Sequence, residues 1–132
     1  MKLNFTITEL CKSKTALKAG INNTPSMGAA DNLMCLIVNL LQPLRDKLGK
    51  PIIVTSGYRC THLNRILDGK ANSQHLVGQA ADIKVKDMSA SALQNFIATS
   101  GLEFDQCINE YNRWVHVSYN IKGNRKQCFN IG

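Results

Sequence analysis

Apolar residues recur at helical spacing over residues 31–48, and this pattern constrains the fold more than any other feature of the chain. They return every three or four positions, as residues on one face of an α-helix do, until Gly49 ends the pattern. Pro43 lies inside the segment, so we expect a kink or a break there unless the helix already ends at Gln42. The apolar positions of this predicted helix are Leu33, Met34, Ile37, Val38, Leu40, Leu41, Leu44 and Leu48.

The other segments predict helices early in the chain and strands later. Thr8 can cap a helix over residues 9–19, which Gly20 ends, and residues 22–28 then form a loop. A β-branched run at 52–55 predicts a buried strand. Beyond it we expect a helix over 60–67, a strand over 80–85, a helix over 89–99, and strands near 104–110, 114–119 and 127–131. This order is typical of an α+β domain with an antiparallel sheet and helices packed on it.

Length and charge narrow the class of protein. At 132 residues, with 44% hydrophobic and 19% charged residues, the chain predicts a single globular domain over residues 1–132. The net charge of +7 favours polyanionic partners such as nucleic acid, an anionic membrane or an anionic cell wall. The basic residues are dispersed, however, which is typical of a solvated basic surface. Aromatic platforms and nucleic-acid recognition motifs are lacking, so we expect no nucleic-acid partner.

The cysteines and the amino-terminal residues indicate where the chain is made. Five cysteines without a CxxC pair predict neither a disulfide framework nor a cysteine zinc site, and a reducing compartment is the simplest interpretation. The first residues lack the apolar stretch of a signal peptide, and no segment approaches the length of a membrane span. We therefore expect a monomer that is made in the cytoplasm and is not inserted into a membrane.

Two of the three histidines lie where a polar segment gives way to an apolar one. His75 precedes Asp82, which falls on a predicted strand, and His116 falls on a later strand. Imidazole and carboxylate are both good zinc ligands, and three protein ligands with one open position is the arrangement of catalytic zinc sites. Each residue also has an ordinary structural explanation, as a hydrogen-bonded core histidine or a capping aspartate. Their spacing alone does not decide between the two.

The residues around His75, Asp82 and His116 decide between a zinc site and ordinary structural roles. An SxHxxGxAxD pattern spans residues 73–82 and WVHVS spans 114–118. Further matching stretches are Glu9–Leu10, Asn23–Ser26, Leu41–Arg45, Gly49–Pro51, Ser56–Arg59 and Phe104–Gln106. On these stretches, over nearly the whole chain, the sequence resembles the zinc DD-peptidases, or M15 peptidases, and particularly their small branch common in phages and prophages. The resemblance implies Zn2+ bound by His75, Asp82 and His116, in the fold that these peptidases share with the hedgehog signalling domain.

A hydrolase of this kind needs a base that takes a proton from the attacking water and passes it to the leaving amine. Family members use a carboxylate that often lies three residues before the last histidine, where this chain has Arg113. Glu110 is the candidate instead. A three-residue hairpin loop would place it opposite Trp114 and on the sheet face of His116, whereas a two-residue loop would place it on the other face. The structural alternative is an exposed charge at a strand end.

Two further residues are candidates for contact with substrate. Arg59 is similar to the family arginine that binds substrate and stabilises the anionic tetrahedral intermediate, although it could instead tie down its loop. Ser73 resembles a family serine near the substrate, and a turn-capping role fits it equally well. If Glu110 is not the base, Asp105 and Glu103 are next in line.

The function that the resemblance implies is zinc-dependent hydrolysis of peptide bonds in bacterial peptidoglycan. Carboxypeptidase and endopeptidase action both fit, with stem or cross-bridge peptides as the substrate. We expect a minimal phage endolysin or virion lysin that reaches the wall after release or delivery, with the positive charge helping to retain it there. The alternative is a non-catalytic, zinc-stabilised wall-binding or structural module on the same fold, and Arg113 keeps that alternative open.

Overall fold

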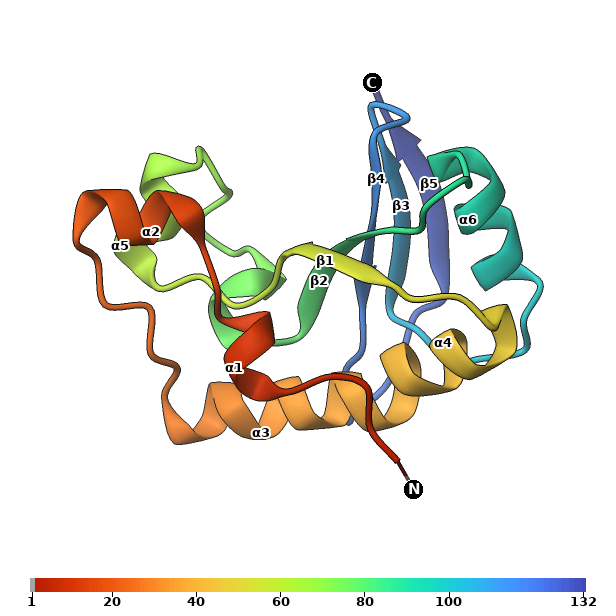
Figure 1. Cartoon of the computed structure of the whole chain (residues 1–132), viewed down its shortest axis with the longest axis horizontal. Helices are drawn as coiled ribbons and strands as arrows, with labels where there is room; N and C mark the ends of the chain where they lie inside the picture. Colours follow the sequence, from red (N-terminus) through yellow and green to blue (C-terminus); the bar gives the residue numbers. More distant parts are fainter. Residues whose placement is uncertain (1) are drawn as a thin grey trace.

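A five-stranded sheet and a long helix organise the chain in the computed structural model, which describes residues 2–132 (Figure 1). The strands are β1 (Ile53–Ser56), β2 (Ala80–Lys84), β3 (Gln106–Glu110), β4 (Trp114–Ser118) and β5 (Gln127–Ile131). Their order in the sheet is β1-β2-β4-β3-β5. The α+β class is confirmed.

The expectation of a wholly antiparallel sheet is wrong at one strand. β1 to β4 pair antiparallel with their neighbours, but β5 pairs parallel with β3. The chain leaves β4, passes β3 through the segment 119–126, and adds β5 on the far side of β3. Because β5 runs opposite to β4, and β3 does too, β5 and β3 share one direction. The sheet is therefore mixed.

The long helix is continuous but has three parts. It comprises α3 (Met27–Leu36), a π-helical stretch η1 (Ile37–Leu41) and α4 (Gln42–Leu48). Ser26 caps its start, four residues earlier than the apolar pattern suggested, because its hydroxyl accepts the amide of the third residue beyond it. The break expected at Pro43 does not occur. Proline has no N–H to donate to the preceding turn. The wider π-helical turn just before Pro43 accommodates this missing hydrogen bond.

This 22-residue helix, Met27–Leu48, is long and apolar enough to cross a membrane by length and composition alone. The expectation that no segment reaches such a length is therefore wrong. Its apolar face is occupied, however, since Leu33, Leu36, Leu40 and Leu44 are fully buried in the core. A core helix of a globular domain has the same composition. The absence of membrane insertion stays a prediction.

The amino-terminal helix is the clearest departure from the sequence pattern. Two short helices, α1 (Ile7–Leu10) and α2 (Lys14–Ala19), replace the single helix expected over 9–19. The cap of the first is Thr6 rather than Thr8. Ser13 interrupts the helical path because its hydroxyl accepts the amide of Ala16 and starts the second helix. The helices α5 (Thr61–Ile66) and α6 (Ala90–Ala98) lie close to the expected positions, whereas the 3-10 turn η2 (Gln74–Val77) was not expected.

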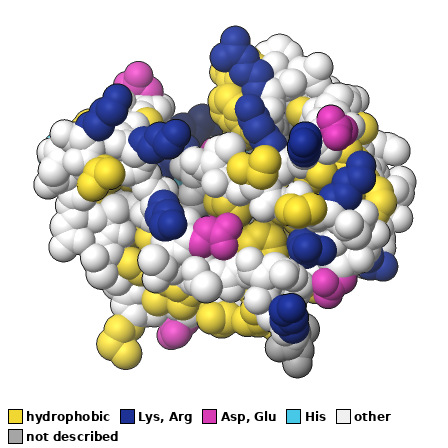
Figure 2. Space-filling model, in the orientation of Figure 1, with side chains coloured by type: hydrophobic (Ala, Val, Ile, Leu, Met, Phe, Trp, Pro, Cys, Tyr) yellow, Lys and Arg dark blue, Asp and Glu magenta, His cyan; other side chains and the backbone are white. Residues whose placement is uncertain are grey.

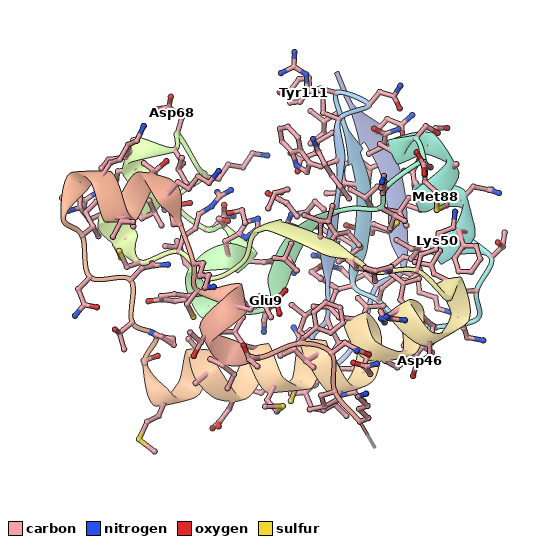
Figure 3. All side chains as sticks on the ribbon, viewed as in Figure 1. Glu9, Asp46, Lys50, Asp68, Met88 and Tyr111 are labelled. Atoms are coloured by element: carbon pink, nitrogen blue, oxygen red, sulfur yellow. The ribbon has the colours of Figure 1, made fainter. Side chains whose placement is uncertain are left out.

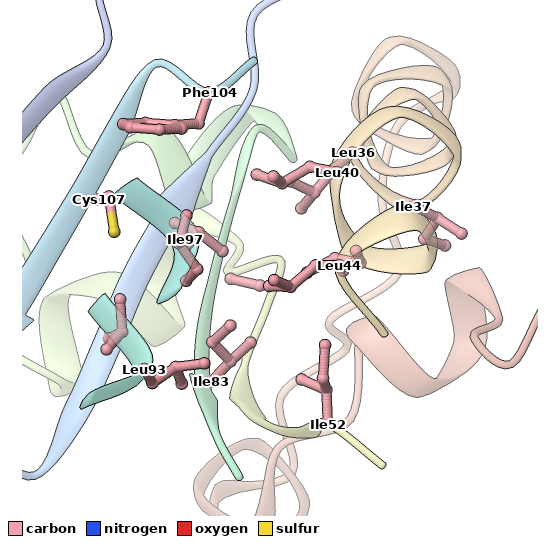
Figure 4. Packing of buried hydrophobic residues seen from close by; sticks show 14 of the residues in the cluster. Leu36, Ile37, Leu40, Leu44, Ile52, Ile83, Leu93, Ile97, Phe104 and Cys107 are labelled. Carbon is pink, nitrogen blue, oxygen red and sulfur yellow. The ribbon is translucent and has the colours of Figure 1, made fainter. Parts of the chain in front are cut away.

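One hydrophobic cluster joins the long helix, α6 and a single face of the sheet (Figure 4). Its members drawn and labelled there include Leu36, Leu40, Leu44, Ile52, Ile83, Leu93, Ile97, Phe104 and Cys107. β1 was expected to be buried and is instead a half-exposed edge strand, with Ile53 51% exposed. It is Ile52, just before the strand, that enters the core.

Strand alternation sends the remaining side chains to the opposite sheet face. In β4, Val115 and Val117 are in the core cluster, so Trp114 and His116 point the other way. That second face looks toward the segment that carries α5 and η2, seen to the left of the sheet in Figure 1. The fold thus reserves one face of the sheet for the core and the other for a site.

Candidate metal centre

Three side chains from η2, β2 and β4 converge on the second face of the sheet. His75, Asp82 and His116 are each buried, with 4%, 5% and 9% of their surface exposed. Asp82 and His116 are register partners on neighbouring strands, so their side chains leave the sheet side by side. Asp82 Oδ1 lies 3.3 Å from His75 Nε2 and 3.2 Å from His116 Nδ1. One ligand atom from each residue falls within 4.8 Å of the other two, so the group could hold a metal ion.

His75 owes its position to the tight turn that carries it. The Ser73 hydroxyl accepts the His75 amide and starts η2, which confirms the capping alternative for this serine. Gly78 ends the turn with a φ of 77°, and a Cβ there would lie 2.3 Å from the carbonyl oxygen of Ala29 in α3. Only glycine fits this close approach of the turn to the long helix. The chain then enters β2 in time to place Asp82 beside His75.

A backbone carbonyl sets the protonation of the His75 ring. Nδ1 of His75 lies 2.7 Å from the carbonyl oxygen of Gly57. A carbonyl oxygen only accepts, so Nδ1 carries a hydrogen, and Nε2, the atom that faces Asp82, is the nitrogen that can bind a metal. Position 57 requires glycine, because a Cβ there would lie 2.1 Å from the Leu10 carbonyl oxygen. One nitrogen of His75 is therefore held ready to bind a metal.

Asp82 is held in its ionised form in the metal-free structure. Burial by itself would raise the pKa of Asp82, since it disfavours the charged carboxylate. Hydrogen bonds and charge from His116 and His75 act in the opposite direction and prevail, so the pKa lies well below its ordinary range. Ionised carboxylate and neutral imidazole are the forms in which these side chains bind metal.

Arg59 lies beside the same carboxylate. Its Nη2 is 3.5 Å from Asp82 Oδ2, and its Nε donates to the hydroxyl of Ser56 at 3.1 Å. Its Nη1 lies 3.4 Å from Asn64 Oδ1. With 14% of its side chain exposed, the guanidinium is steered by three partners toward the metal-ligand group. The loop-tying alternative is thus part of its role, and contact with substrate stays a prediction.

A cavity of about 650 Å³ opens over the three candidate ligands. The surface is hollowed at this place in Figure 2, between two lobes with Lys and Arg side chains around the opening. Asp68 and Tyr111 lie on opposite sides of the opening in Figure 3. The polar wall includes Arg59, Lys70, Asn72 and Ser73, and the sheet contributes Ile108, Glu110, Trp114 and Ile131.

Glu110 lies on the sheet face that the three-residue hairpin predicts. It pairs with Trp114, and Ile108 pairs with His116, so Glu110 shares a face with His116 and lines the cavity. Its Oε2 accepts the Trp114 indole N–H at 3.0 Å. Tyr111 forms the loop with the next two residues and has a positive φ. The exposed-charge alternative is wrong, and the role of Glu110 as base stays a prediction.

Asp105 and Glu103, the two further candidates for the base, make contacts outside the cavity. Asp105 accepts hydrogen bonds from Arg125 and Gln74, and Glu103 is 64% exposed and pairs with Lys126. Neither lines the cavity. Gln74 and Arg125 both line the cavity, but they could not be singled out from the sequence because neither belongs to a residue type that ligates metal.

Comparison with known proteins agrees with this geometry. The family model described as Peptidase M15 matches residues 3–118. The zinc D-Ala-D-Ala carboxypeptidase of Streptomyces albus G is 32% identical over 94 residues, which cover 69% of this chain. The same alignment covers 35% of that relative, so this chain matches about a third of its length. The matched residues include all three candidate ligands, and the chain belongs to the peptidase M15 family.

Proposed function

We propose that the protein is a zinc-dependent peptidase that cleaves peptide bonds of bacterial peptidoglycan. The observation that carries the proposal is the convergence of His75, Asp82 and His116 at the floor of an open cavity. Two imidazoles and one carboxylate, with room left for a fourth ligand on the cavity side, suit zinc in a catalytic site. Membership of the peptidase M15 family and the similarity to a zinc D-Ala-D-Ala carboxypeptidase support the same assignment.

The metal's chemistry in such a site is that of a Lewis acid, which polarises the scissile carbonyl and makes water a stronger nucleophile near neutral pH. The chain's own residues supply the rest. Glu110, on the cavity wall, accepts the proton of the attacking water and delivers it to the leaving amine. The indole of Trp114 holds one of its carboxylate oxygens in place and leaves the other without a hydrogen-bond partner among the described residues.

Arg59 stabilises the negative charge that develops on the carbonyl oxygen. Its guanidinium lies at the edge of the metal-ligand group and offers a fixed planar array of donors to that charge. The hydroxyl of Ser73 accepts the His75 amide, which leaves its hydrogen to donate to a substrate carbonyl or carboxylate. The apolar wall at Ile108 and Ile131 fits small aliphatic side chains of a stem peptide.

A minimal lysin is the biological role that we propose within this function. The surplus of seven positive charges favours retention on an anionic wall, and Lys70 and Arg125 add cations at the cavity itself. The competing candidate is a wall-binding or structural module that has lost its base, and the position of Glu110 on the cavity wall argues against it.

Defined muropeptides test the proposal. The purified chain is incubated with stem peptides and cross-linked dimers, with and without a chelator, and the products are identified by mass. We expect loss of a terminal residue or opening of a cross-link, and inhibition by the chelator. Zinc binding without any cleavage of any muropeptide would instead establish the non-catalytic module.

A further inference from the structure

A line of hydrogen bonds leads from the surface to His116. Arg125 donates to the carboxylate of Asp105 through its backbone amide at 2.9 Å, its Nε at 3.0 Å and its Nη2 at 2.7 Å. The side chain of Arg125 is 56% exposed, whereas Asp105 is only 2% exposed. On its other side, Asp105 Oδ2 accepts Nε2 of Gln74 at 2.8 Å. Oε1 of Gln74 then lies 3.4 Å from Nε2 of His116.

The direction of each bond is fixed by what its atoms can do. The side-chain hydrogen bond from Arg125 is the main reason that the pKa of Asp105 is lowered to about 2, so this carboxylate is ionised at neutral pH and only accepts. Gln74 must therefore turn its NH2 group toward Asp105 and its oxygen toward His116. An amide oxygen also only accepts, so Nε2 of His116 carries the hydrogen. That leaves Nδ1, the atom 3.2 Å from Asp82 Oδ1, as the nitrogen that can bind a metal.

The two histidines of the site are thus prepared in different ways. His75 is oriented by a backbone carbonyl, which no side-chain substitution removes. His116 depends on the orientation of one amide, and an unsupported amide can rotate by half a turn. Its NH2 group would then face Nε2 of His116 and favour a ring with the hydrogen on Nδ1. In that form Nδ1 has no lone pair for a metal.

We propose that Gln74, Asp105 and Arg125 are positioning residues that hold the His116 ring with Nδ1 free to bind the metal. The inference rests on the proposed function and deepens it. It also gives the segment between β4 and β5 a role at the metal centre, although Arg125 lies beyond residues 3–118, where the family match ends.

Zinc affinity, measured by competition with a chromophoric chelator, tests the inference without relying on activity. Gln74→Leu keeps the approximate shape of the side chain and removes both of its hydrogen bonds. Loss of a partner that orients a metal-ligating histidine typically costs about 10- to 100-fold in affinity, and we expect a loss in that range. Arg125→Ala should weaken zinc binding in the same direction by a smaller factor, because it acts through two intervening side chains.

The double variant separates positioning from general loosening. If Arg125 acts through Gln74, adding Arg125→Ala to Gln74→Leu should weaken zinc binding no further. Asn124→Ala is the matched control, because Asn124 lies in the same segment and its side chain accepts, among residues 2–132, only the amide of Asn120. Its zinc affinity should equal that of the unsubstituted protein. Losses that multiply in the double variant, or an equal loss in the control, would overturn the inference.

Nitrogen-15 NMR of the imidazoles in the metal-free protein provides the second readout. We expect Nε2 of His116 to carry a hydrogen in the unsubstituted chain, and to carry it in only part of the molecules in Arg125→Ala. Arg125 is mostly exposed, so this variant should remain folded. An unchanged His116 spectrum would contradict the inference even if the protein binds zinc. Failure of the unsubstituted chain to bind zinc at all would instead refute the proposed function, while the NMR comparison would still decide the hydrogen-bond argument.

Discussion

Replacing Glu110 by glutamine should abolish most turnover and leave the metal in place. Glutamine keeps the length of the side chain and an oxygen that can accept the Trp114 indole N–H, the contact that now spans 3.0 Å. It cannot accept a proton from water. General acid–base assistance is worth about 10²- to 10⁴-fold, so the turnover number should fall by at least about 100-fold. At 1.36 kcal/mol for each factor of ten, this corresponds to about 3 kcal/mol or more in the activation barrier.

The assay follows muropeptide cleavage by mass while zinc content is measured on the same samples. Zinc should stay at one equivalent because Glu110 is not among the three residues whose ligand atoms converge. Trp114→Phe is the matched control, since it removes the hydrogen bond to Glu110 but keeps the carboxylate and an aromatic ring. We expect it to lose far less turnover than Glu110→Gln. Glu110→Gln cleaving at the unsubstituted rate would refute the reasoning and leave the base unassigned.

The other predictions concern the ligands, the arginine and acid stability. His75→Ala or His116→Ala should abolish zinc binding, because two protein ligands hold the ion too weakly, and zinc analysis after dialysis checks this. Arg59→Lys should lower turnover with zinc content unchanged, since an ammonium lacks the planar donor array; equal turnover would assign Arg59 to structure alone. Asp105 has its pKa lowered from 3.8 to about 2, so its stabilising contribution is complete above about pH 4 and is lost as the pH falls toward 2. Chemical denaturation of the metal-free protein should therefore show a gap between the unsubstituted chain and Asp105→Asn that narrows over this range.

Local sequence patterns were sufficient for most of the fold. The apolar periodicity of residues 31–48, the cap at Ser89 and the strand patterns around the ligands each depend on neighbours in the chain. The departures arise where two local preferences compete or where distant segments decide. Ser13 splits the first helix because its side chain accepts a backbone amide. The direction of β5 is decided by its pairing with β3, a strand about twenty residues earlier in the chain.

The candidate site also has a part that could be predicted from local sequence and a part that could not. The three candidate ligands lie in motifs that a single sequence displays, and Glu110 needed only the hairpin loop length to be placed. The contacts of Gln74 with Asp105 and His116 could not be predicted, because they join residues 31 and 42 positions apart and leave no periodic trace. A tryptophan is by its type ordinarily a core residue, yet strand alternation turns Trp114 to the cavity.

A zinc titration of the metal-free protein, followed by muropeptide cleavage at each addition, tests the central claim most directly. The part of the chain that the structure describes holds one buried set of ligands, which predicts that the rate rises from zero in proportion to added zinc and levels off at one equivalent per chain. Cleavage that is already complete in the metal-free protein, or that never appears at any zinc concentration, would contradict the assignment of His75, Asp82 and His116 as the centre of a zinc peptidase.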